Sequence, residues 1–65
     1  MIAYAYNAET KVIAMEIKGD DIPSIKDIFN EYFDPDKFGL TYSPDFGANE
    51  GLINNGDFET IDVRA

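Results

Sequence analysis

The sequence predicts an α+β domain in which one antiparallel sheet of four to five strands carries one helix on one face. Two patterns indicate this fold. Between residues 20 and 34 the apolar side chains recur every three or four positions, which is the period of a helix. On either side they alternate with small or polar residues, which is the period of a strand. The element order is therefore ββαββ or ββαβββ, and two hairpins joined through the helix are the simplest arrangement.

Residues 1–18 have the pattern of a β-hairpin with its turn at residues 7–10. If Tyr6 faces Lys11 across this turn, the large apolar residues of both strands share one face, and we expect the helix on that face. The other face then carries Ala3, Ala5, Val12, Ala14 and Glu16. This small-residue face is either a flat contact surface or exposed to solvent.

Residues 20–34 are predicted to form the helix. Asp20 and Asp21 precede the first turn, where the helix dipole favours carboxylates, and Pro23 suits the first helical position. The helix ends at Asp34 because a residue before proline resists helical dihedral angles. Its apolar stripe consists of Ile22, Ile25, Ile28, Phe29, Tyr32 and Phe33. The opposite face carries Ser24, Asp27, Asn30 and Glu31, with Lys26 at its margin.

The last third of the chain predicts a third strand and a second hairpin. Residues 38–43 alternate and stop at Pro44, and residues 45–51 have the composition of a loop. Asn55-Gly56 favours a type I′ turn between Leu52-Ile53 and Phe58. The arm over residues 57–63 has a mixed pattern that is typical of an edge strand.

The size and composition of the chain exclude several classes of protein. With 65 residues, there is room for one domain (residues 1–65) with a stability on the order of 3 to 5 kcal/mol, and none for a deep active-site cleft. Histidine and cysteine are absent, which removes the commonest general base and thiolate metal sites, so we expect no enzymatic activity and no cofactor. The start of the chain lacks the pattern of a signal peptide, and no apolar run reaches the roughly 20 residues of a membrane span. We therefore expect a soluble, cytoplasmic protein.

One metal motif needs to be considered. Asp34, Asp36, Gly39 and Asp45 occupy positions 1, 3, 6 and 12 of an EF-hand loop. However, Phe38 at position 5 offers no side-chain oxygen, an aspartate replaces the usual glutamate at position 12, and Pro44 opposes an exit helix. A turn in which aspartates accept local hydrogen bonds explains these residues better.

The acidic residues are the remaining feature with functional content. Thirteen acidic residues against five basic ones give a formal charge of −8, which repels nucleic acids and anionic membranes and favours a basic partner. Neighbouring acids on the helix, and Asp57 and Glu59 on the last arm, are spaced like successive phosphates of a nucleic-acid strand. The candidate partner-binding residues are Asp20, Asp27, Glu31, Asp34, Asp36, Asp57 and Glu59, with Tyr32 and Tyr42 as possible aromatic anchors. The alternative is a surface that serves only solubility.

In length, acidity, and lack of cysteine, histidine and catalytic motifs, the chain resembles small phage-encoded inhibitors of bacterial defence, including anti-CRISPR proteins that mimic DNA. The resemblance covers composition over the whole chain and no shared motif. It implies a stoichiometric blocker of a basic nucleic-acid-binding protein in the host cytoplasm, acting as a monomer or small homo-oligomer. A different possibility is a protein-interaction or assembly module that docks through the small-residue face or an unpaired strand edge.

Overall fold

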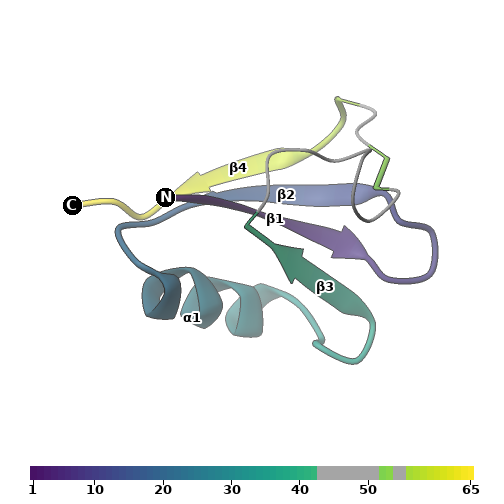
Figure 1. The fold of residues 1–65 in the computed structure, drawn as a ribbon, viewed down its shortest axis with the longest axis horizontal. Coiled ribbons are helices and arrows are strands. Elements are labelled where there is room, and N and C mark those ends of the chain that lie inside the picture. Colours follow the sequence, from purple (N-terminus) through teal and green to yellow (C-terminus); the bar gives the residue numbers. More distant parts are fainter. Residues whose placement is uncertain (43–51, 54–55) are drawn as a thin grey trace.

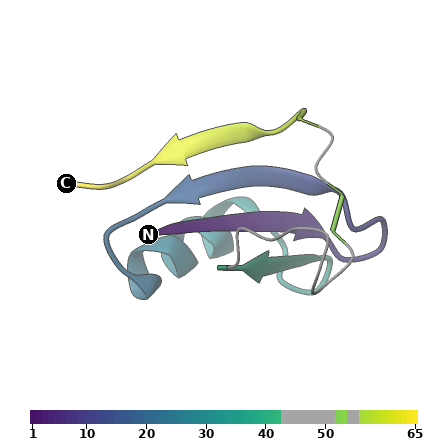
Figure 2. The same ribbon diagram turned by 45° about the horizontal axis from the view of Figure 1, so that its top comes forward.

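The computed structural model describes residues 1–42, 52–53 and 56–65 and contains two layers, a sheet and a helix (Figure 1). The elements are β1 (Ile2–Asn7), β2 (Ile13–Lys18), α1 (Ile22–Tyr32), β3 (Phe38–Thr41) and β4 (Glu59–Asp62). The strands lie in the order β3-β1-β2-β4, and α1 covers one face of the sheet (Figure 2). The predicted α+β class, with one sheet and one helix, is confirmed.

The sheet is mostly antiparallel, with one parallel pair at its edge. β1 pairs antiparallel with β2 and β3, whereas β4 runs parallel to β2. Ile53 also forms a parallel bridge with Val12, so the chain before Gly56 and the chain after it run in the same direction along β2. The predicted second hairpin is therefore wrong, although Gly56 has the positive φ of 77° that its turn signal predicts. Asn55 lies outside the described residues.

The parallel pairing has a physical advantage over the predicted hairpin. It aligns Ile61 with Ile17, so Ile61 packs against the core between sheet and helix. Burial of the Ile61 side chain stabilises this arrangement. The prediction that the last arm is an edge strand is confirmed, because β4 ends the sheet.

The register of the first hairpin differs from the predicted one. Ala3 faces Ile17 and Ala5 faces Met15, but Tyr6 then faces Ile13, which makes Ala14 the extra residue of a β-bulge. The bulge turns the side chain of Ile13 to the face opposite Met15.

The register decides which face the helix covers. α1 packs on the face with the two alanines, where Ala3, Ala5, Ile17 and Ile25 are fully buried. The prediction that the helix lies on the large-residue face is wrong, because alanine lets the helix backbone approach closely while its own branched and aromatic side chains fill the space. On the other face Tyr4, Ile13 and Leu52 form a second buried cluster, with Tyr6 and Phe58 against it. The small-residue face is therefore not an exposed contact surface.

The ends of α1 follow the local signals closely. The Asp21 carboxylate accepts a hydrogen bond of 2.9 Å from the backbone N–H of Ser24, so Asp21 is the N-cap. Hydrogen bonds from the backbone and the side chain of Ser24 lower the pKa of Asp21. The helix ends at Tyr32, earlier than predicted, and the N–H of Phe33 closes its last turn by donating to the carbonyl of Phe29.

Candidate functional site

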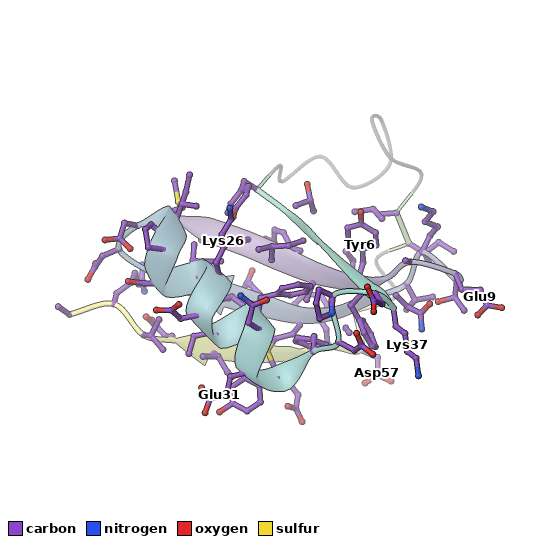
Figure 3. The ribbon with its side chains drawn as sticks, turned by 90° about the horizontal axis from the view of Figure 1, so that it is seen from below. Tyr6, Glu9, Lys26, Glu31, Lys37 and Asp57 are labelled. Atoms are coloured by element: carbon purple, nitrogen blue, oxygen red, sulfur yellow. The ribbon has the colours of Figure 1, made fainter. Side chains whose placement is uncertain are left out.

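The helix separates the charged residues of the molecule into two sides. Lys26 and Glu31 are five residues apart, which places them about 140° apart around the helix axis. Lys26 lines a hollow with Leu40 and Tyr42, so it lies on the β3 side. Figure 3 shows Glu31 on the opposite side of α1, the side that is turned toward the β4 edge of the sheet. Asp27 lies between these two directions and faces solvent.

β4 adds an acidic residue on the helix side of the sheet. Glu59 pairs with Met15, whose side chain lies in the core under the helix, so Glu59 lies on the helix side of β4. Asp57 precedes β4 rather than lying within it, and Figure 1 shows the start of β4 on the side of the molecule away from α1. We call Asp27, Glu31 and Glu59, which are all exposed, the acidic side.

The charge of the acidic side is weakly compensated. α1 and β4 together contain one basic residue, Lys26, and it lies on the β3 side. Among the described residues, Asp27, Glu31 and Glu59 take part in no salt bridge. Lys37 lies in the turn between α1 and β3, beyond the last residue of the helix. The acidic side therefore presents exposed carboxylates from two elements to solvent.

The remaining basic residues are held elsewhere. Lys18 is 4.0 Å from Glu16 on the helix-free face, and Lys11 lies over the ring of Tyr6, 5.6 Å from its centroid. Arg64 binds Asp62 at 2.6 Å near the C-terminus. Hydrogen bonds from Arg64 lower the pKa of Asp62 to about 2.

Asp34 and Asp36 lie apart from the acidic side, in the turn between α1 and β3. The Asp34 carboxylate accepts from the N–H of Asp36 at 2.9 Å, and its carbonyl accepts from the N–H groups of Lys37 and Phe38. These are the local turn bonds that the sequence predicts. Phe38 begins β3, so the chain leaves the geometry of an EF-hand loop there, and Asp45 lies outside the described residues. Over the described ranges, the acidic residues form no cluster of three that could hold a metal ion.

Asp20, Tyr32 and Tyr42 are also separate from the acidic side. Asp20 accepts a hydrogen bond of 3.0 Å from the N–H of Ala65, so it lies by the C-terminal residues. Tyr32 is 57% exposed in the last turn of α1, and Tyr42 follows β3 on the Lys26 side. All nine predicted residues are exposed, but the structure distributes them over several regions, and only the acidic side combines residues of α1 and β4.

The structure shows two features that sequence reasoning missed. One is a hollow of about 370 Å³ between α1 and β3, lined by Lys26, Phe29, Asn30, Leu40 and Tyr42. The other lies on the helix-free face, where the Tyr4 hydroxyl donates to Glu16 at 2.9 Å and the Thr60 hydroxyl donates to Glu16 at 3.3 Å. Burial, followed by the bond to Glu16, raises the pKa of Tyr4. The correct hairpin register, with Tyr4 opposite Glu16, is the signal that predicts this second cluster.

The chain matches no protein-family model, and comparison with curated proteins and with solved structures gives no significant match. Among the described residues, no helix has the length and apolar character that a membrane span requires. A proposal for its function therefore rests on the geometry and charge of the chain itself.

Proposed function

We propose that this protein is a non-enzymatic inhibitor that occupies the basic nucleic-acid-binding surface of another protein by imitating the charge of DNA. The observation that carries the proposal is the acidic side, which combines exposed carboxylates of α1 and of β4, among them Glu31 and Glu59. Neither carboxylate forms a salt bridge within the described residues. Their charges are therefore available to a cationic partner.

The mechanism is competition for a groove. Long-range attraction between the acidic side and a basic surface raises the association rate, and short pairs with lysine or arginine then fix the register. Asp27 and Glu31 are one helical turn apart, about 6 Å along the axis, and this spacing resembles that of successive phosphates. While the inhibitor is bound, nucleic acid is excluded from the groove, and no turnover is needed.

The proposed partner is a defence protein of a bacterial host, of the CRISPR-Cas or restriction type. Support comes from the resemblance in size and composition to phage-encoded inhibitors, and from the net charge of −8, which disfavours direct binding to nucleic acid. In this role the protein acts in the cytoplasm of the host cell as a stoichiometric blocker.

The test is capture followed by release with DNA. The chain is immobilised, a bacterial lysate is passed over it, and bound protein is eluted with short duplex DNA. A DNA mimic predicts release by the duplex, because both ligands compete for one surface. The eluted protein should then lose DNA binding in a gel-shift assay at one equivalent of inhibitor. The proposal is contradicted if duplex DNA does not release the captured protein and the captured protein does not bind DNA.

A matched pair of variants assigns the effect to the acidic side. Glu31→Lys and Glu9→Lys both change the net charge from −8 to −6, since each replaces one negative charge with a positive one. Glu9 lies in the turn between β1 and β2, outside the acidic side. Glu31→Lys should weaken inhibition clearly more than Glu9→Lys. Equal losses contradict a localised site and indicate a dependence on net charge alone.

Salt provides an independent check. Raising the ionic strength from about 0.1 to 0.5 M shortens the screening length from roughly 10 Å to under half that value. Complex formation should weaken sharply over this range. Binding that is insensitive to salt contradicts electrostatic mimicry.

The alternative function, an assembly module, is compatible with the fold only if the partner binds at a strand edge. Ala3 and Ala5 lie under the helix and are fully buried, so a partner has no access to them. β3 and β4 remain as the two outer strands of the sheet. Light scattering that shows a dimer, together with loss of both dimer and activity in an edge-strand variant, would favour this alternative.

A further inference from the structure

The outer edge of β4 has backbone groups that point away from the sheet. The N–H of Val63 donates to the carbonyl of Lys18 in β2 at 2.8 Å. Successive residues of a strand direct their backbone groups to opposite edges, so those of Thr60 and Asp62 point outward. Their outward N–H and carbonyl groups have no backbone partner among the described residues. An added strand thus has two donors and two acceptors to pair with.

Acidic side chains flank this edge on both faces of the sheet. Glu59 lies on the helix side of β4, and Glu31 lies on the side of α1 that is turned toward the β4 edge. Asp62 pairs in register with Lys18 and lies on the helix-free side, where it forms a salt bridge with Arg64. Charge complementarity therefore favours a strand whose basic side chains point to the helix side, because Lys18 and Arg64 already offset Asp62 on the other side.

The same charges disfavour a second copy of this chain. An antiparallel pair of β4 strands related by a two-fold axis would bring Glu59 and Asp62 of one copy close to those of the other. Like charges on neighbouring strands are destabilising, and charged edge strands are a common protection against self-association. A basic strand meets no such repulsion.

We propose that the β4 edge accepts an extended, lysine- or arginine-rich segment of the partner as a fifth strand. The inference rests on the proposed function in one respect, namely that the partner surface is basic. Backbone hydrogen bonds to Thr60 and Asp62 supply affinity, and Glu59 and Glu31 select positive side chains. The contact then has a defined register, which charge attraction alone does not provide.

The test uses two synthetic probes on the full chain. The first is an acetylated, amidated hexapeptide in which lysine and valine alternate, and the second is the same peptide N-methylated at every residue. N-methylation keeps the charge and removes every backbone donor. The first peptide should slow amide hydrogen exchange at Thr60 and Asp62 and should bind about tenfold or more tightly than the second.

The alternative outcomes are distinct. Equal affinities without protection of Thr60 and Asp62 overturn strand addition but leave charge mimicry intact. Absence of binding by both peptides also overturns strand addition, while the DNA-release experiment decides the proposed function separately. Protection of both amides without peptide, together with a dimer in light scattering, overturns the proposal in favour of a second copy as the fifth strand.

A pair of variants at one position tests the same edge. Thr60→Pro removes the outward N–H and places the proline ring there, whereas Thr60→Val keeps the N–H. Both substitutions remove the hydroxyl bond to Glu16, so this loss is matched. Thr60→Pro should weaken binding of the first peptide about tenfold, and Thr60→Val should leave it within about twofold. If Thr60→Pro does not fold, the comparison of the two peptides on the parent chain decides.

Discussion

The two sides of α1 differ in charge although one short helix forms both. On the β4 side Glu31 and Glu59 are exposed carboxylates without a salt bridge among the described residues. On the β3 side Lys26 borders a hollow whose lining includes Phe29 and Leu40. A turn of about 100° separates Lys26 from Asp27, its neighbour in sequence. Position around the helix axis, and not net composition, therefore decides where the negative potential lies.

This difference depends on how α1 is attached to the sheet. Ile25 and Phe29 hold the helix over the two alanines of β1, and both are buried. The helix cannot rotate without removing these side chains from the core. The attachment thus fixes which residues face the β4 edge and which face β3.

Ile25→Ala should have the largest effect, because it removes the side chain that anchors both sides. Ile25 is fully buried, and truncation of such a residue costs about 2 to 5 kcal/mol. This is comparable to the whole stability expected of a chain of 65 residues. Urea unfolding followed by circular dichroism should show a mostly unfolded variant.

Ile22→Ala is the matched control for Ile25→Ala. Ile22 is also in α1 but is 41% exposed, so its truncation should cost clearly less. Equal losses at both positions would mean that the helix is not anchored through Ile25.

Gly39→Ala should have a smaller effect that is confined to β3 and the helix-free face. Gly39 pairs with Tyr6, and a Cβ atom at this position would meet the end of the tyrosine ring. Displacing the ring should cost about 1 to 3 kcal/mol in the free energy of unfolding. Binding through the acidic side should be unchanged once the variant is folded.

A double-mutant cycle checks the cause of the Gly39 effect. In a Tyr6→Ala background the added methyl group has room, so Gly39→Ala should cost much less there. An equal cost in both backgrounds would assign the loss to the backbone of β3 and not to the ring.

The smallest effect is expected at Asp62, the acid of β4 that has an internal partner. The side-chain and backbone N–H groups of Arg64 donate to it, and they lower its pKa from 3.8 to about 2. Because the pKa of the folded state is the lower one, the stabilising contribution is present above pH 3.8. It is lost as the pH falls from 3.8 to about 2.

Carboxyl NMR titration and acid unfolding measure this contribution. Arg64→Ala should return the Asp62 midpoint toward its ordinary value, and Asp62→Asn should flatten the pH dependence of stability below pH 3.8. A midpoint near 3.8 in the parent chain would show that the pair with Arg64 does not persist in solution.

The fold class could be predicted from the sequence because its signals are local. Residues 22–32 carry the helical period, Asp21 is an N-cap, and alternation marks the strands. The register could not be predicted, since the bulge at Ala14 inverts the face of Ile13 without a distinctive residue pattern. The parallel partner of β4 was also missed, because the benefit of burying Ile61 depends on residues far away in sequence.

The candidate site was predictable only in part, for the same reason. Helical periodicity correctly separates Asp27 and Glu31 from the apolar stripe. It does not show that Glu59 lies on the helix side of the sheet, which follows from the pairing of β4 with β2. Nor does it show that Tyr42 lies beside Lys26.

The most direct measurement is inhibition by the Asp27→Lys/Glu31→Lys variant, assayed as DNA binding by the captured protein. Lys26→Glu, which alters the opposite side of the same helix, is the control. The double variant should lose inhibition with an unchanged circular dichroism spectrum, and Lys26→Glu should retain it. Full inhibition by the folded double variant would contradict the assignment of the acidic side as the binding surface.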